Sequence, residues 1–114
     1  MVRIAICDDV RYYTEVLSVM IHHWAQKNQL NLELEVFESG EEVIWAAEER
    51  GSFLAVFMDV ELTGINGIET AAALRKADKY NSQIILIEGV ERKDLGIAIM
   101  NRLLRTCEYD YLEI

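Results

Sequence analysis

The sequence predicts an α/β protein in which helices pack on a doubly wound parallel sheet. Short runs rich in Val, Ile, Leu and Phe alternate with longer segments that have helical periodicity. Most of these short runs are apolar on both sides, which is typical of strands buried between two layers of helices. No repeat, linker or low-complexity stretch interrupts the pattern, so residues 1–114 are expected to form one domain.

Strand-like and helix-like segments alternate to the end of the chain, beginning with a strand. The expected strands cover residues 2–7, 32–36, 53–58, 83–87 and 109–112, and the expected helices cover residues 10–27, 39–50, 67–77 and 92–105. Two consecutive parallel strands need a long crossover, which a helix supplies. The alternation therefore predicts a parallel sheet with right-handed connections.

Local signals justify the elements of the first half. The run VRIAIC is a short apolar strand, and the helix at 10–27 has apolar residues every three or four positions. At 32–36, Leu and Val alternate with Glu, as in a strand with one more exposed face. Ser39 and Glu42 form a capping box that begins the second helix, and Gly51 ends it.

Similar signals justify the second half. The runs FLAVFM and QIILI are buried strands, and Asn66 can cap the helix at 67–77. The helix at 92–105 is apolar around much of its circumference, so it requires burial on more than one side. Helical side chains expected to pack in the interior include Trp24, Trp45, Ile68, Ala71, Ala72 and Leu74.

The composition excludes several classes of function. Apolar residues make up 52% of the chain, and 20 acids against 11 bases give a formal charge of −9. This acidity disfavours direct contact with nucleic acid or with an anionic membrane surface. Cys7 and Cys107 are too few for a disulfide framework, and Cys7 is expected to be a buried thiol. Without a signal peptide or a membrane-length apolar run, a soluble cytoplasmic domain is expected.

Acidic residues follow two of the predicted strands. Asp8 and Asp9 come after the first strand, and Asp59 comes after the central one. Because ligands of open parallel sheets bind at the carboxyl ends of the strands, we expect these acids to form a cation site. Mg²⁺ prefers such oxygen ligands. Asp9, Asp59 and the backbone carbonyl of Glu61 are the predicted ligands, with Asp8 acting mainly through a metal-bound water.

Asp59 is also a candidate nucleophile. A carboxylate beside Mg²⁺ can attack a phosphorus centre and form an acyl phosphate. Gly64 and Gly67 allow the loop after Asp59 to turn closely past such a site. The alternative for an acidic pair after a strand is a helix cap, a role that Asp9 could fill. Acids at the ends of two buried strands favour the site over the cap.

These motifs resemble the receiver domain of two-component response regulators. The resemblance runs over nearly the whole chain and rests on IAICDD (4–9), FESGEE (37–42), MDVELTGINGIE (58–69), IILIEG (84–89) and YDYL (109–112). The second and third of these motifs are most similar to receivers that are joined to LytTR-type DNA-binding domains.

The resemblance implies a flavodoxin-like (CheY-like) sheet of five strands in the order 2-1-3-4-5. It also implies that Asp59 is the phosphoacceptor and that Asp8 and Asp9 are the acidic pair that binds Mg²⁺. A sensor histidine kinase would donate the phosphoryl group, and the domain would control a transcriptional output domain.

The chain departs from the receiver pattern in four ways. Glu88 stands where receivers have the Thr or Ser that senses the phosphoryl group, and an acid there would repel that group. Ile114 lies near the position of the usual lysine, and Thr63 replaces the usual proline. The fifth helix is missing, which predicts a homodimer, an exchanged segment, or a piece truncated from a longer regulator.

Three functions remain open. The first is a phosphoacceptor signalling module, which is not a turnover enzyme. The second is a degenerate receiver that acts as a phosphorylation-independent interaction or dimerisation module, as Glu88 would indicate. The third is a hydrolase of the haloacid-dehalogenase type, which the sequence DVELT at 59–63 vaguely echoes. The chain is too short for the later motifs of that family, so the third ranks last.

Overall fold

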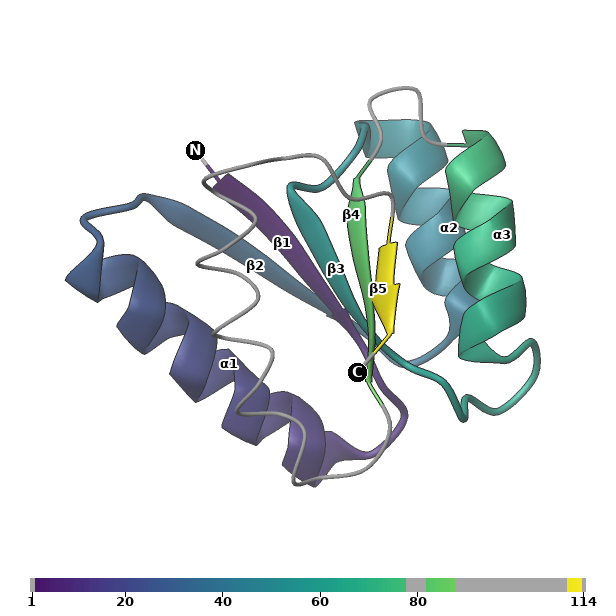
Figure 1. Ribbon diagram of the computed structural model, residues 1–114, viewed down its shortest axis with the longest axis horizontal. Helices are drawn as coiled ribbons and strands as arrows, with labels where there is room; N and C mark the ends of the chain where they lie inside the picture. The colour runs from purple at the N-terminus through teal and green to yellow at the C-terminus, as the bar shows by residue number, and fades with distance from the viewer. Residues whose placement is uncertain (1, 78–81, 88–110, 114) are drawn as a thin grey trace.

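A five-stranded parallel sheet lies at the centre of the protein (Figure 1). Its strands are β1 (Val2–Cys7), β2 (Leu32–Phe37), β3 (Ala55–Asp59), β4 (Gln83–Ile87) and β5 (Tyr111–Glu113). Their spatial order is β2-β1-β3-β4-β5, and every neighbouring pair is parallel. This order confirms the predicted doubly wound, flavodoxin-like sheet.

The structure is a computed structural model that describes residues 2–77, 82–87 and 111–113. The predicted helix at 92–105 lies outside the described residues, as do Glu88 and Ile114. What the sequence predicts for these positions therefore stays a prediction, and so does the missing fifth helix.

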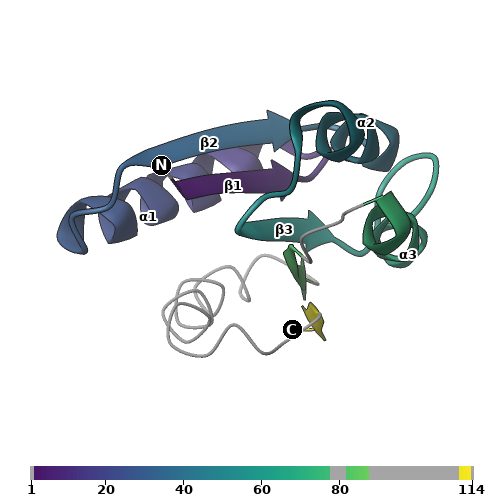
Figure 2. The same ribbon diagram turned by 90° about the horizontal axis from the view of Figure 1, so that it is seen from above.

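Three described helices flank the sheet: α1 (Arg11–Lys27), α2 (Gly40–Arg50) and α3 (Gly67–Ala77). Helix α1 lies on one face, and α2 and α3 lie side by side on the other (Figures 1 and 2). Among the described helices, none is both long and apolar enough to cross a membrane.

The strands β1, β3 and β4 alternate their side chains between two hydrophobic clusters. In β3, Val56 and Met58 pack with residues of α2 and α3, whereas Ala55 and Phe57 pack with residues of α1. All four are at most 1% exposed. This period of two on a strand buried on both faces explains why the sequence runs are apolar throughout.

Capping residues fix where α2 and α3 begin. The Ser39 hydroxyl accepts a hydrogen bond from the Glu42 N–H at 3.2 Å, as predicted, but the Glu42 carboxylate accepts from the Glu38 N–H instead of that of Ser39. Asn66 and Glu69 cap α3 reciprocally, because each side chain accepts a hydrogen bond from the other's N–H.

Three strands have boundaries that differ from the predicted ones: β2 extends to Phe37 instead of residue 36, and β3 and β5 are shifted. Strand β3 covers Ala55–Asp59 instead of 53–58, since its register with β4 extends to the pair Asp59–Ile87. The last strand covers Tyr111–Glu113 instead of 109–112. The shift in β3 makes Asp59 the last residue of the strand, so its position is set by the pairing of the sheet.

Three residues that were expected in the interior are exposed, and these expectations were wrong. Ile68 is 53% exposed, Trp45 is 57% exposed, and Ala72 of α3 is exposed as well. In α3, Gly67 and Leu74 face the sheet, a phase that turns Ile68 outward. In α2, the buried residues are Gly40, Val43, Ala46 and Ala47. Trp45 therefore points away from the core, whereas Trp24 of α1 is buried, as expected.

The thiol of Cys7 is fully buried at the end of β1, as the sequence predicts. Its Sγ donates a hydrogen bond to the backbone oxygen of Ser39 at 3.3 Å. Burial, and then the negative charge of Asp8, raise the pKa of the Cys7 thiol from 9.0 to about 12. The thiolate, which is the reactive form, is therefore disfavoured.

We expect Cys7 to resist alkylation in the folded protein at pH 8 and to react once the chain is unfolded in urea. Peptide mass spectrometry after iodoacetamide treatment resolves Cys7 from Cys107. Between pH 9 and 12 the unfolded chain loses the thiol proton before the folded chain does. The contribution of the buried, neutral Cys7 thiol to the free energy of unfolding should therefore fall as the pH rises through that window. Rapid alkylation of native Cys7 at pH 8 would contradict the burial.

Candidate functional site

Three acidic side chains meet at the carboxyl edge of the sheet. Asp8 and Asp9 follow β1, and Asp59 ends β3, which is the neighbour of β1. The last register pair of these strands is Cys7–Met58, so the next residues of each strand emerge side by side. One carboxylate oxygen from each of the three acids lies within 4.8 Å of the others.

The three carboxylates differ in exposure and in local support. Asp8 is only 2% exposed, Asp59 is half-buried and Asp9 is exposed. Asp8 Oδ1 accepts a hydrogen bond from the Val10 N–H at 2.9 Å, and Asp59 Oδ1 accepts one from the Glu61 N–H at 3.1 Å. Such bonds to the backbone two residues ahead orient a carboxylate.

Asp9 does not cap α1, so this alternative to a site is wrong. The N-cap residue of α1 is Val10, and no side chain forms a cap hydrogen bond there. Asp9 instead contacts the loop after β3: its Oδ2 accepts hydrogen bonds from both the Thr63 N–H at 3.1 Å and the Thr63 hydroxyl at 2.7 Å. These contacts join the acidic pair to the loop that follows Asp59.

Sequence reasoning missed this role of Thr63, which it treated only as a replacement for proline. Asp9 and Thr63 lie 54 residues apart, and neither helical nor strand periodicity relates them. The one sequence signal is the position of Thr63 four residues after Asp59, in a loop that must pass the end of β1. A hydroxyl in that loop can reach an acid at the end of the neighbouring strand.

Two glycines shape the loop between β3 and α3. Gly64 has a φ of +87°, a conformation that favours glycine. The N–H of Gly67 donates to the Val60 carbonyl at 2.8 Å, and a Cβ at Gly67 would overlap the backbone of Asp59 and Val60. The close turn that the sequence predicts at these glycines is therefore present.

The remaining predicted site residues are only partly described. Glu61 is exposed, and its N–H orients Asp59, whereas the use of its carbonyl as a ligand stays a prediction. Glu88 lies outside the described residues, but it directly follows Ile87. Ile87 pairs in register with Asp59 and accepts a hydrogen bond from the Val60 N–H at 3.3 Å.

The donor set fits a hard divalent cation. Three carboxylates supply oxygen atoms, which Mg²⁺ prefers over nitrogen and sulfur ligands. Their mutual repulsion at this distance favours a bound cation. Asp8 and Asp59 also make interactions within the protein, so the cluster is stabilised in part by its own surroundings.

Comparison with solved structures finds receiver domains of response regulators. The N-terminal domain of a response regulator/sensory box/GGDEF protein from Carboxydothermus hydrogenoformans has a TM-score of 0.75 at 17% identity, over 93% of this chain and 96% of that one. The response regulator domain of Thermotoga maritima CheB has a TM-score of 0.65 at 22% identity, over 98% and 76% of the two chains.

A third neighbour is the response regulator protein TrrA from Thermotoga maritima, solved in complex with Mg²⁺-BeF. Its TM-score is 0.61 at 23% identity, over 100% of this chain and 86% of that one. At these identities the likeness shows a shared fold. The predicted receiver fold is thus confirmed, whereas the likeness to LytTR-type receivers stays a prediction.

Comparison at the level of sequence gives a different family. The family model of the threonylcarbamoyl-AMP synthase C-terminal domain matches residues 12–107. The threonylcarbamoyl-AMP synthase of Pyrococcus abyssi is 45% identical over 42 residues, which are 37% of this chain and 12% of that protein. The match thus spans about an eighth of the length of this curated relative. Sequence reasoning from motifs did not predict this relationship.

Proposed function

The chain belongs to the family of the threonylcarbamoyl-AMP synthase C-terminal domain. From this membership, the receiver fold and the acidic site, we propose that the chain is a receiver-type regulatory domain. In this proposal it binds Mg²⁺ and accepts a phosphoryl group on Asp59. The observation that carries the proposal is the convergence of Asp8, Asp9 and Asp59. The family match begins at residue 12, so it includes Asp59 but not Asp8 and Asp9, and the convergence of the three acids needs an explanation of its own.

In the proposed site Asp9 and Asp59 would hold the cation through carboxylate oxygens, and Glu61 would hold it through its backbone carbonyl. Asp8, which is buried and accepts a hydrogen bond from the Val10 N–H, would act through a water between it and the cation. When bound, Mg²⁺ supplies positive charge that offsets the charge of the phosphoryl oxygens.

Asp59 supplies the nucleophile. The Glu61 N–H holds Asp59 Oδ1 and thereby fixes the orientation of the carboxylate at the end of β3. A carboxylate oxygen attacks phosphorus, an O–P bond forms, and the bond from phosphorus to the donor breaks. The donor in a cell would be the phosphohistidine of a sensor histidine kinase. The product is an acyl phosphate on the protein itself, and in this proposal the domain uses it as a signal and is not a turnover enzyme.

Phosphorylation would alter the loop of Thr63 and pass a signal to an output domain or to a second copy. The homodimer predicted from the sequence belongs to this proposal. Light scattering on the folded protein should report two copies, and a well-folded monomer would contradict this part of the proposal.

The proposal is tested by incubating the protein with acetyl phosphate and Mg²⁺ and then measuring its intact mass. We expect one phosphoryl group per chain and none after the cation is removed with EDTA. No adduct on the folded protein would contradict the proposal. Steady release of phosphate from varied monoesters would instead favour the hydrolase.

A second candidate function follows from the family match over residues 12–107. The domain would be a degenerate receiver that serves as an interaction module beside a threonylcarbamoyl-AMP synthase, without phosphorylation. Glu88 and Ile114, at the positions of the usual hydroxyl and lysine, would then mark a lost switch. The two functions differ in whether a phosphoryl adduct forms. The first requires the adduct, whereas the second requires that folded protein treated with acetyl phosphate and Mg²⁺ keeps its unmodified mass.

The Thr63 hydroxyl should hold Asp9 in position as a metal ligand. We expect Thr63→Val, which keeps the shape but removes the donor to Asp9 Oδ2, to weaken Mn²⁺ binding by about 10-fold. Thr63→Ser retains the donor and should bind Mn²⁺ like the natural chain. Isothermal titration calorimetry measures both. Tighter binding by Thr63→Val would show instead that Thr63 competes with the cation for Asp9.

A further inference from the structure

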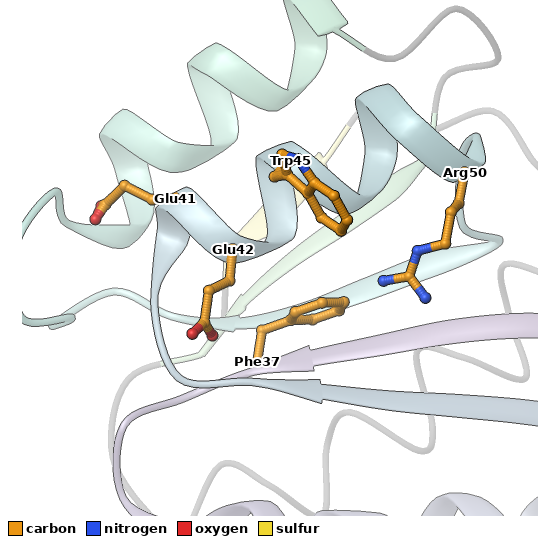
Figure 3. A pocket seen from close by; sticks show the side chains of 5 residues that line it. All are labelled: Phe37, Glu41, Glu42, Trp45 and Arg50. Carbon is orange, nitrogen blue, oxygen red and sulfur yellow. The ribbon is translucent and has the colours of Figure 1, made fainter.

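A groove opens between α2 and the end of β2, and its lining includes none of the three acids of the site (Figure 3). Its volume is about 510 Å³, within the usual range of ligand sites. The residues that line it are Phe37, Glu41, Glu42, Trp45 and Arg50. No step of the proposed phosphoryl chemistry uses these side chains.

Aromatic rings form the walls of the groove and are held in place. The Phe37 ring meets the Phe53 ring edge to face, with centroids 6.0 Å apart. The guanidinium of Arg50 lies 5.8 Å from the centroid of the Trp45 ring, and its Nη1 is 2.8 Å from Glu35 Oε2. The ion pair with Glu35 thus holds the guanidinium of Arg50 in place beside the Trp45 ring. Such preorganised walls lower the cost of ordering side chains on binding.

The groove also exposes apolar surface beside an edge strand. Trp45 is 57% exposed, and Phe37, which lines the other side of the groove, is the last residue of β2. In the described sheet β2 pairs only with β1, so its outer edge presents backbone N–H and C=O groups. An extended segment can pair with such an edge and place alternate side chains in an adjacent pocket.

The charges at the groove favour a basic occupant. Glu38, Glu41 and Glu42 are exposed at the end of the groove where α2 begins. Within the described residues, neither Glu41 nor Glu42 forms an ion pair, whereas the one base in the lining, Arg50, is paired with Glu35. The net charge of the lining is therefore negative. This disfavours nucleic acid and anionic membranes, as does the charge of the whole chain.

We propose that this groove binds an extended basic segment of a partner protein. One large apolar side chain of the segment lies between Phe37 and Trp45, and a Lys or Arg next to it pairs with Glu41 and Glu42. The backbone of the segment runs along the outer edge of β2. A large exposed Trp in a preformed groove, surrounded by charges that fix the register, is the usual arrangement of a binding hot spot.

A phage-displayed library of random heptapeptides, selected on the full chain, tests the proposal. We expect enriched peptides to combine an aromatic or long aliphatic residue with a nearby Lys or Arg. Fluorescence polarisation with the selected peptides should show at least about 10-fold weaker binding by Trp45→Ala and by the Glu41→Lys/Glu42→Lys double variant. Binding by the natural chain should also weaken as salt is added.

Matched variants control for charge and for exposed apolar surface. Glu48→Lys/Glu49→Lys makes the same charge change on the same helix outside the groove, and Ile68→Ala removes an exposed apolar side chain on α3. Both should bind the peptides like the natural chain. Circular dichroism melts verify that every variant is folded. No enrichment, a preference for acidic peptides, or equal binding by Trp45→Ala would each overturn the proposal.

Discussion

Replacing Asp59 by Asn should abolish the phosphoryl adduct that the protein forms with acetyl phosphate and Mg²⁺. The amide keeps the shape of the side chain and can still accept a hydrogen bond from the Glu61 N–H, but it is not a nucleophile toward phosphorus. It also removes one of the three negative charges of the cluster, so cation binding should weaken as well. Intact mass after a fixed incubation measures the adduct.

Glu61→Gln is the matched control for this experiment. It neutralises an exposed acid two residues away and leaves intact both the N–H that orients Asp59 and the backbone carbonyl. The adduct of Glu61→Gln should therefore form as in the natural chain. An adduct of equal yield on Asp59→Asn would show that another residue accepts the phosphoryl group. Equal loss in both variants would point to the charge of the loop rather than to the nucleophile.

Replacing Gly67 by Ala should lower both stability and cation affinity. An added Cβ would overlap the carbonyl oxygen of Asp59 and the Cα of Val60, and neither of these backbone atoms can move without disturbing β3. Overpacking of this kind costs about 1–3 kcal/mol in the free energy of unfolding. The forced shift would also move the loop that places Thr63 against Asp9.

Urea unfolding followed by circular dichroism measures the first effect, and Mn²⁺ titration measures the second. Ile68→Ala is the control, because it alters the next residue of α3 at an exposed position and should change stability by less than about 0.5 kcal/mol. If Gly67→Ala unfolds at the same urea concentration as the natural chain, the close contact between Gly67 and the backbone of Asp59 and Val60 is contradicted.

Much of the fold could be predicted because periodicity and strand composition act locally. The apolar runs identify strands buried on both faces, and the alternation with helices fixes parallel pairing. The phase of a helix is harder to predict. Hydrophobicity alone places Ile68 and Trp45 in the interior. In α3, however, Gly67 must face Asp59, and this turns Ile68 outward. In α2, the small residues face the sheet and allow the helix to approach it, and this turns Trp45 outward.

In the site too, some features follow from local sequence patterns and others depend on the tertiary structure. The acids gather because topology brings the ends of β1 and β3 together, and the sequence reveals where those strands end. The hydrogen bonds between Thr63 and Asp9 depend on the path of a loop, which no periodicity describes. The motifs at strand ends also predict a fold better than a family, since any doubly wound sheet places polar residues at that edge. The match to the threonylcarbamoyl-AMP synthase C-terminal domain was missed for that reason.

The central claim is that Asp8, Asp9 and Asp59 form one divalent-cation site. Titration with Mn²⁺, followed by the relaxation of water protons, tests it most directly because it needs neither a kinase nor an output domain. We expect one Mn²⁺ ion per chain, displaced by Mg²⁺, with at least about 10-fold weaker binding by Asp9→Asn. Absence of saturable binding, or equal affinity in Asp9→Asn, would contradict the claim.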